Sequence, residues 1–268
     1  MNGRPAASVI VRARDEASTV GRVLSLLHRQ TVRPEIIVVD SGSTDGTDRI
    51  AGERCDRLIR IAPHDFTYGY ALNLGAAAAS ADIHFALSAH CLPPDREWIA
   101  RSLALYARAD VAGTGGHDPG ASEVFYQDHR HARAHPYTGF SNHASSWRAD
   151  VWREFPFDER LGAAEDKEWG LRVTRAGWVL AFSREVNVDM SHAWRSARES
   201  FVRERRCAAA LASFGQLGPY GLDDLARDWW SSLPRDHHSR AFHRFVNYRR
   251  CAALAGRWLG VRSGVVRP

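Results

Sequence analysis

Residues 36–47 read "IIVVDSGSTDGT", and this stretch decides the fold class. An apolar, β-branched run ends at Asp40, and a polar loop with two glycines, residues 41–47, then opens a helical pattern. The run predicts a buried strand, and a loop that opens a helix can bind a ligand with its backbone amides. The loop is neither a GxGxxG sequence nor a P-loop, so it indicates neither a dinucleotide site nor a Walker site.

Similar strand–loop–helix units lie on both sides of this stretch. The predicted strands comprise residues 7–13, 35–40, 57–61, 83–88 and 111–116, and the predicted helices comprise residues 18–30, 47–55, 70–80 and 96–109. Ser18 is the expected N-cap of the first helix. Alternation of apolar strands with helices predicts an α/β fold whose mostly parallel sheet is covered by helices on both faces. In such sheets the ligand lies beyond the carboxyl ends of the strands.

The composition of the 268-residue chain excludes several classes of protein. No apolar run approaches the roughly 18 residues of a membrane span, and no signal-peptide core precedes the first strand. We therefore expect a cytoplasmic protein, with peripheral attachment to a membrane left open. The four cysteines form no CxxC pair and are expected to be reduced. The net charge of +5 comes from arginines mixed with acids, which does not imply nucleic-acid binding.

Polar side chains follow the first two predicted strands. Arg12, Arg14 and Glu16 follow the strand at residues 7–13, in a loop that also fits a solvated turn with capping acids. Asp40 ends the second strand. Its carboxylate can accept the imide N–H of uracil or thymine, a donor that cytosine and adenine lack at the equivalent ring position. Asp40 at the end of the second strand is therefore expected to select a uracil or thymine base.

At this point the chain resembles the glycosyltransferase family 2 proteins, which have the GT-A fold. The resemblance rests, in order, on "SVIVRARDEASTVGRVLSLLHRQ", "EIIVVDSGSTDGT", "YGYALNLGAAAA", "FALSAHCLP" and "FDERLGAAEDKEWGLRVTRAGW", which together span about residues 8–194. Within the family the chain looks most like bacterial members that elongate rhamnose-containing glycans or decorate natural products. The resemblance implies a catalytic domain over residues 1–194, with a nucleotide-binding half to about residue 116 and an acceptor half after it. Residues 195–268 are expected to form a helical C-terminal extension.

The family implies roles for the residues at the strand tips. Asp40 would contact the nucleotide base, and Arg14 and Glu16 would lie near the base or the ribose. Asn73 would face the nucleotide and its diphosphate, although many relatives carry arginine where Leu72 stands, which puts one phosphate contact in doubt. The full set of expected nucleotide-binding residues is Arg12, Arg14, Glu16, Asp40, Ser41, Gly42, Asn73, Ser88 and Ala89.

Ser88, Ala89 and His90 stand where the family has its D-x-D motif, whose acids hold a divalent cation on the donor diphosphate. Imidazole can ligate Mn²⁺, although a hard ion prefers oxygen. Some GT-A transferases use a D-x-H version with a second histidine further on, and His192 stands where that ligand would come. The resemblance thus implies a Mn²⁺ or Mg²⁺ site at His90 and His192. The alternative is that His90 only hydrogen-bonds the diphosphate and no metal binds tightly.

Glu165 and Asp166 lie at the start of a predicted helix, where acids are commonly dipole-stabilising caps. The resemblance identifies them instead as the family's acidic motif, with Asp166 as the general base and Glu165 as an acceptor-binding residue or the alternative base. Trp169, one turn on, would be a platform for a sugar. Asn142 and His143 are expected in the donor-sugar or acceptor pocket, and a buried polar turn is the competing interpretation. The other tryptophans of this region, Trp147, Trp152 and Trp178, are expected in the core.

These roles imply an inverting glycosyltransferase that takes a sugar from a UDP- or dTDP-sugar. The acceptor would be a hydroxyl of a carbohydrate, a lipid-linked molecule or a natural product, and a homodimer through the C-terminal helices is left open. One alternative is a non-catalytic module that binds sugar nucleotides or glycans and has lost its metal acids. A nucleotidyltransferase is disfavoured, because it needs a Gly-rich loop after the first strand and "VRARDEAST" has no glycine.

Overall fold

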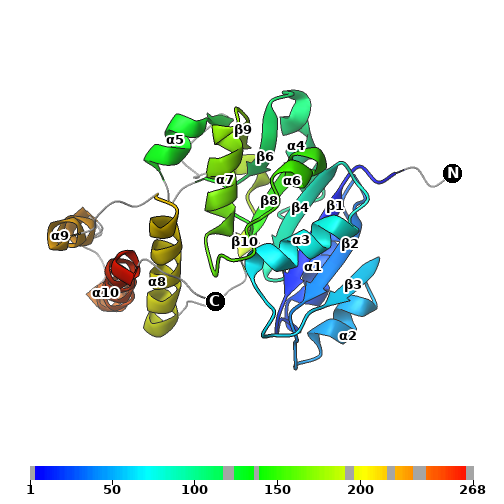
Figure 1. Cartoon of the computed structure of the whole chain (residues 1–268). Helices are drawn as coiled ribbons and strands as arrows, with labels where there is room; N and C mark the ends of the chain where they lie inside the picture. Colours follow the sequence, from blue (N-terminus) through cyan, green and yellow to red (C-terminus); the bar gives the residue numbers. More distant parts are fainter. Residues whose placement is uncertain are drawn as a thin grey trace. The chain divides into compact units, whose positions relative to one another are not determined.

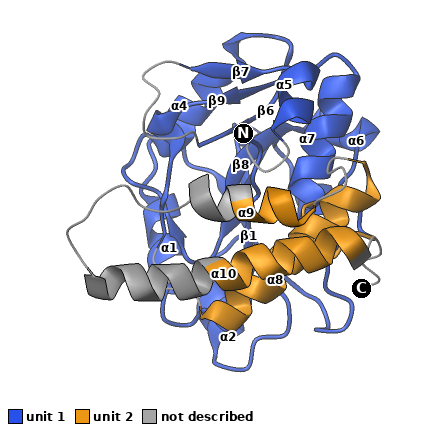
Figure 2. Cartoon of the chain, turned by 90° about the vertical axis from the view of Figure 1, so that its left-hand side faces the viewer, with its two compact units in different colours: residues 1–159, 165–191 blue, residues 160–164, 192–268 orange. Residues whose placement is uncertain are grey.

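A computed structural model describes residues 4–116, 124–135, 139–190, 196–215, 221–231 and 240–263. The chain divides into two compact units (Figure 2). Unit 1 comprises Met1–Glu159 and Glu165–Ser191, and unit 2 comprises Arg160–Ala164 and His192–Pro268. The functional domain boundary expected at residue 194 stays a prediction.

Unit 1 is built on a sheet with the strand order β3-β2-β1-β4-β8-β6-β9-β7 in the described part of the chain (Figure 1). The first four strands in this order run parallel, β8 is antiparallel to β4 and β6, and β7 is antiparallel to β9. A second, small sheet pairs β5 with β10. The strands are β1 (Ser8–Ala13), β2 (Glu35–Asp40), β3 (Arg57–Arg60), β4 (Ile83–Ser88), β5 (Cys91–Leu92), β6 (Val111–Gly115), β7 (Phe125–Gln127), β8 (Ala144–Arg148), β9 (Val179–Phe182) and β10 (Asp189–Met190).

Helices cover both faces of the large sheet, as the sequence predicts. One face packs against α1 (Val20–His28), α2 (Thr47–Gly52) and α4 (Trp98–Ala104). The other packs against α3 (Tyr68–Ala78), α6 (Ala149–Glu154) and α7 (Glu165–Arg175). The short helix α5 (His129–Ala134) contacts α7.

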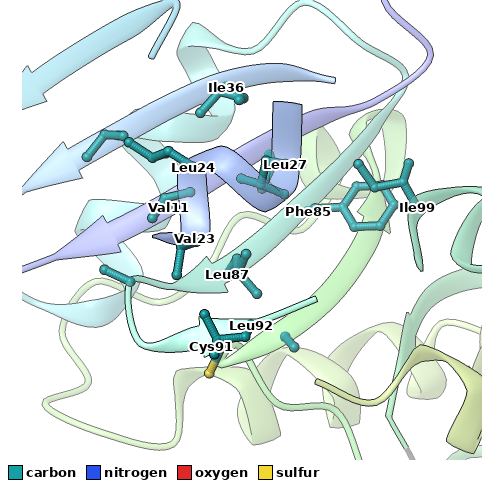
Figure 3. Close-up of a cluster of buried hydrophobic side chains, with 14 of the residues drawn as sticks. Val11, Val23, Leu24, Leu27, Ile36, Phe85, Leu87, Cys91, Leu92 and Ile99 are labelled. Atoms are coloured by element: carbon teal, nitrogen blue, oxygen red, sulfur yellow. The ribbon is translucent and has the colours of Figure 1, made fainter. Parts of the chain in front are cut away.

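The core on the α1 face packs against β1 and β4, two neighbouring strands of the parallel part. Val23, Leu24 and Leu27 of α1 point toward the sheet, where Val11 and Phe85 lie (Figure 3). These side chains are fully buried, and full burial of one large aliphatic side chain contributes about 1.5–3 kcal/mol. The packing holds the carboxyl ends of β1 and β4 side by side.

The predicted elements of the first half are confirmed, with shorter helices and one wrong cap. Helix α1 begins at Val20 rather than at residue 18, and Ser18 is not its N-cap. The carbonyl of Glu16 accepts hydrogen bonds from the N–H groups of Thr19 and Val20 and closes the turn instead. The helix predicted at residues 96–109 spans only α4 before a 3₁₀ turn, Leu105–Ala107. The parallel arrangement holds for β3, β2, β1 and β4, and the remaining strands make the sheet mixed.

Gly75 allows α3 to lie directly on β1. A Cβ atom at this position would meet Cγ2 of Ile10 at 2.3 Å, and Ile10 is fully buried. Gly75→Ala is therefore expected to overpack the interface and to lower the free energy of unfolding by about 1–3 kcal/mol. This loss outweighs the gain of up to about 1 kcal/mol that alanine brings to a helix interior. Urea unfolding of both proteins measures the difference.

Gly21→Ala in α1 is the matched control. Its added Cβ would lie 3.4 Å from Cγ2 of Ile50, which is an ordinary contact. Only the helix-propensity gain then remains, so this variant should be as stable as the wild type or more stable by up to about 1 kcal/mol. Equal stability of the two variants would show that α3 does not pack tightly on β1.

Unit 2 contains α8 (Ala197–Ser213), α9 (Leu222–Ser231) and α10 (Arg240–Ser263). Ser196 and Glu199 form a capping box that starts α8. A Cβ atom on Gly256 or Gly260 of α10 would lie 2.3 Å from a backbone carbonyl oxygen of α8, so the two helices approach backbone to backbone. No helix among the described residues combines the length and the apolarity that crossing a membrane requires.

Candidate active site

The loops that follow β1 and β2 are joined by hydrogen bonds. The N–H of Asp15 donates to Oγ of Ser43 at 2.9 Å, and the N–H of Thr44 donates back to Oδ1 of Asp15 at 2.8 Å. The N–H of Ala17 donates to Oδ2 of Asp45 at 2.9 Å. The two strand tips that the sequence singled out therefore form one surface at the carboxyl edge of the sheet. Arg14 is exposed on it, with Nε 4.0 Å from the Asp15 carboxylate.

Asp40 shapes the loop that follows β2. Its side chain is buried, and Oδ1 accepts hydrogen bonds from the N–H groups of Gly42 and Ser43, both at 3.0 Å. Oδ2 accepts from Oγ of Ser43 at 2.5 Å. Gly42 has φ +81°, and a Cβ there would lie 2.6 Å from Cγ of Pro63, so the tight loop requires glycine. Contact of Asp40 with a nucleotide base stays a prediction.

Ser41, Ser88 and Ala89 are buried at the same edge. Oγ of Ser41 donates to the carbonyl of Ala13 at 3.2 Å. The N–H of Ser88 donates to the carbonyl of His143, and the N–H of Ala89 donates to the carbonyl of Arg12, both at 3.0 Å. These hydrogen bonds hold the tips of β1, β2, β4 and β8 together. Contact of Ser41, Ser88 and Ala89 with a nucleotide stays a prediction.

His90 contacts Glu16 across the edge, with 2.7 Å between Nδ1 and Oε1. Both side chains are mostly buried, and the other oxygen of Glu16 accepts from Oγ1 of Thr19 at 2.9 Å. A carboxylate only accepts hydrogen bonds, so Nδ1 of His90 carries the hydrogen in this contact. The pair ties the end of β4 to the loop after β1.

The described residues do not fit the cation site that the resemblance implies. They contain no group of three or more His, Cys, Asp or Glu side chains that could hold a metal ion. Ser88 and Ala89 bring no carboxylate to the place of the D-x-D acids, and a hard cation prefers oxygen ligands. His192 lies outside the described residues.

Asn142 holds the two acids at the start of α7. Its backbone N–H donates to Oδ2 of Asp166 at 3.2 Å, and its Nδ2 donates to Oε1 of Glu165 at 3.3 Å. Its carbonyl accepts from Nη2 of Arg12 at 2.5 Å, and its Oδ1 accepts from Oγ of Ser145 at 3.0 Å. Asn142 is 2% exposed, and its contact with a sugar stays a prediction. The competing interpretation, a buried polar turn, describes it.

The two acids differ in their environment. Glu165 is 4% exposed, and its burial together with the neighbouring Asp166 charge raises the pKa of Glu165 to about 7. The charge of Arg12 and the hydrogen bond from Asn142 act in the opposite direction. Asp166 is only partly buried. An acceptor hydroxyl can therefore reach Asp166 but not Glu165.

His143 lies between the end of β4 and Asp166. Its carbonyl accepts from the N–H of Ser88, and its Nδ1 lies 2.7 Å from Oγ of Ser141. Although part of the imidazole reaches solvent, the surrounding protein lowers the pKa of His143, and the charge of Asp166 partly opposes this shift. A neutral imidazole at neutral pH is thus placed beside the acid pair, and its contact with a substrate stays a prediction.

Trp169 cannot be a platform for a sugar, so that expectation is wrong. The indole is fully buried between Phe140 and Phe157, with ring centroids 4.7 and 5.6 Å apart. Its Nε1 donates to the carbonyl of Phe155 at 2.7 Å. Trp147 is fully buried as expected, and Trp152 and Trp178 pack partly buried against the same core.

Asn73 is held by hydrogen bonds to the segment that follows α6. Its Nδ2 donates to the carbonyl of Phe157 at 2.9 Å and to Oε1 of Glu159 at 2.8 Å. Its Oδ1 accepts from Nε1 of Trp152 at 2.9 Å and from the N–H of Phe157 at 3.1 Å. Both ends of the amide are used within the protein, so Asn73 anchors the segment after α6, and its contact with a nucleotide stays a prediction.

The sequence interpretation missed two residues of this edge. Tyr68, in the first turn of α3, is 42% exposed, and its ring centroid lies 5.2 Å from Cζ of Arg12. Lys167 is the only lysine of the chain, and its Nζ donates to the carbonyls of Phe140 and Gly139 at 2.6 and 3.3 Å. An exposed tyrosine in "FTYGYA" gives no sequence signal of this placement. The only lysine of the chain directly follows the acid pair in the sequence, and this signal could have identified Lys167.

Comparison with known proteins shows what this chain is similar to. The sequence profile of "Glycosyl transferase family 2" matches residues 8–179. Glycosyltransferase AglE of Haloferax volcanii is 28% identical over 205 residues, which are 68% of this chain and 66% of AglE. The O-antigen chain rhamnosyltransferase WbaN of Salmonella anatum is 27% identical over 202 residues, 65% of this chain and 62% of WbaN. The aligned part thus spans slightly less than two thirds of both relatives.

A solved structure shares the architecture. The mannosyltransferase PcManGT from Pyrobaculum calidifontis, in complex with GDP-Man and Mn²⁺, matches 97% of this chain and 73% of that chain with a TM-score of 0.62. The sequences are 18% identical in this alignment, so the likeness concerns the fold. It confirms the fold that the sequence predicted.

Proposed function

This chain belongs to glycosyl transferase family 2, and on that premise we propose that it moves a sugar from a UDP- or dTDP-sugar to an acceptor hydroxyl with inversion. The observation that carries the proposal is the position of Asp166. Its partly exposed carboxylate is fixed by Asn142, at the sheet edge where the joined loops of β1 and β2 would hold the nucleotide.

Asp166 takes the proton of the acceptor hydroxyl in the proposed reaction. The hydroxyl oxygen attacks the anomeric carbon from the face opposite the nucleoside diphosphate, through an oxocarbenium-like transition state. One C–O bond forms as the bond to the diphosphate breaks, which inverts the configuration of the sugar. The departing diphosphate gains charge and requires fixed positive groups or donors at the same edge. Glu165 is buried beside the base and contributes to its position rather than to proton transfer.

The relatives support a glycan product. WbaN is named as a rhamnosyltransferase of an O-antigen chain, so rhamnose is the first sugar to test and a growing glycan the first acceptor. The PcManGT complex holds GDP-Man, so the pyrimidine preference proposed for this chain rests on Asp40 and the loop it shapes. Lipid-linked and natural-product acceptors, and pairing of two copies through the C-terminal helices, remain part of the proposal to be tested.

Turnover assays decide the proposed function. The purified chain is incubated with UDP-, dTDP- and GDP-sugars and with glycan acceptors, and release of the nucleoside diphosphate is measured. Proton NMR of the product gives the anomeric configuration, which should be opposite to that of the donor. A protein that binds these donors but never releases diphosphate with any acceptor would be the non-catalytic binding module. Retention of configuration would contradict the role of Asp166.

Asp40→Ala is expected to weaken binding of UDP or dTDP about 10- to 100-fold, equivalent to roughly 1–3 kcal/mol for the loss of a charge-assisted hydrogen bond. Asp40→Asn keeps an oxygen for the N–H groups of Gly42 and Ser43. Its affinity therefore distinguishes a loss of base recognition from a change in the shape of the loop. Asp48→Ala, on α2 beside Arg60, is the control and should bind as the wild type does. Calorimetric titration measures all four proteins. Tighter binding of GDP or ADP than of both pyrimidine diphosphates would refute the preference.

A further inference from the structure

Arg12 occupies the middle of the carboxyl edge of the sheet. The strand register places it beside Ser88 of β4 on one side and Val39 of β2 on the other. Its carbonyl accepts the hydrogen bond from the N–H of Ala89. The Arg12 side chain therefore starts next to the segment that replaces the D-x-D acids.

The guanidinium of Arg12 uses few of its donors within the protein. A guanidinium has five N–H donors, and the one hydrogen bond described for it joins Nη2 to the carbonyl of Asn142. Nε is buried with no partner in the described part of the chain. Among the ion pairs between described residues, none joins Arg12 to a carboxylate within 4.0 Å. A partly buried cation without an anion, and a buried donor without an acceptor, both cost free energy.

Neighbouring groups hold this cation in place. The ring of Tyr68 lies against the guanidinium on one side, which orients it by a cation–π contact. Asn142 lies between Arg12 and Glu165, because its carbonyl faces Arg12 and its amide faces Glu165. Glu165 therefore feels the charge of Arg12 without pairing with it directly. The remaining donors of Arg12 are left for a ligand.

We propose that Arg12 binds the diphosphate of the donor and supplies the fixed positive charge that stabilises the leaving group. The inference rests on the proposed function and deepens it. An arginine fork matches two phosphate oxygens, and Ser88 and Ala89 provide no carboxylate for a bridging cation. The guanidinium takes over the electrostatic task of that cation as the bond to the diphosphate breaks.

The test compares Arg12→Met with Arg12→Lys. UDP, dTDP and GDP and their nucleosides are titrated calorimetrically against each protein in excess chelator. For the base that the wild type binds best, Arg12→Met should lower the affinity for the nucleoside diphosphate 10- to 100-fold. The affinity for the nucleoside should stay within about threefold of that of the wild type. Arg12→Lys keeps the charge but not the forked geometry of the guanidinium. Its affinity for the diphosphate should lie between that of the wild type and that of Arg12→Met. Arg49→Met, which removes an exposed arginine of α2 paired with Glu53, should bind as the wild type does.

Three results overturn the inference and leave the proposed function standing. The first is diphosphate binding by Arg12→Met equal to that of the wild type. The second is an equal loss for nucleoside and diphosphate, since it would make Arg12 a structural residue. The third is wild-type affinity that disappears in chelator and returns with Mn²⁺ or Mg²⁺, because a cation would then carry the charge. A wild type that binds no nucleoside diphosphate at all refutes the proposed function itself and the inference with it. Thermal unfolding of both variants checks that they fold.

Discussion

Asp166→Asn is expected to lower the rate of sugar transfer by about 10²–10⁴-fold, the contribution of a general base. Affinity for the nucleotide should stay within about threefold. The N–H groups of Asn142 and Lys167 donate to different oxygens of the carboxylate, so the asparagine keeps the shape of the side chain and one of these two acceptors. Its amide cannot take a proton. Initial rates of diphosphate release at saturating donor, with titration of the free nucleotide, measure both quantities.

Glu168→Gln is the matched control on the same helix. Glu168 forms an i, i+4 ion pair with Arg172 at 2.8 Å, so its carboxylate is engaged away from the proposed reaction. This variant should retain the wild-type rate within about threefold. If Asp166→Asn also retains the rate within a few fold, Asp166 is not the base, and Glu165 becomes the candidate despite its burial.

The sequence predicts the first half of the fold because the parallel strands there are continuous apolar runs. The second half contains strands whose sequences lack the apolar or alternating pattern of a strand. β8 reads "ASSWR", and its serines are buried. Oγ of Ser146 lies 2.9 Å from Oη of Tyr106 and 2.7 Å from Oγ1 of Thr114. A polar strand stabilised by partners on two other segments has no local pattern, so its antiparallel insertion between β4 and β6 could not be predicted.

The prediction for Trp169 was wrong, and the periodicity of α7 explains why this residue is buried. Residues four apart lie on one face of a helix, and Glu165, Trp169 and Val173 form the buried face. Trp169 was expected to be a platform for a sugar because it lies one turn after the acid pair. The same spacing predicts the opposite. If Trp169 and Val173 are core residues, Glu165 is buried with them and Asp166 lies off that face.

Glu165→Gln is expected to stabilise the protein above pH 7 and to leave its stability at pH 5 nearly unchanged. Burial raises the pKa of Glu165 from its ordinary value of 4.5 to about 7, so the folded chain holds a proton that the unfolded chain releases between these values. Stability therefore falls as the pH rises through this window. Once the folded state ionises, a buried charge remains beside Asp166. Each pKa unit corresponds to 1.36 kcal/mol, so the shift from 4.5 to about 7 gives a full effect of about 3 kcal/mol.

The glutamine carries no charge at any pH and keeps an oxygen for Nδ2 of Asn142, which now donates to Glu165. Denaturant unfolding of both proteins from pH 5 to pH 8.5 gives the difference in the free energy of unfolding at each pH. Groups that do not interact with Glu165 titrate alike in the two proteins, so the difference should grow with pH to about 3 kcal/mol in favour of Glu165→Gln. Glu154→Gln removes an exposed carboxylate at the end of α6 and should show no such growth. A difference between Glu165→Gln and wild type that does not change with pH would mean that Glu165 is ionised throughout this range, and its burial would then have to be balanced by the charge of Arg12.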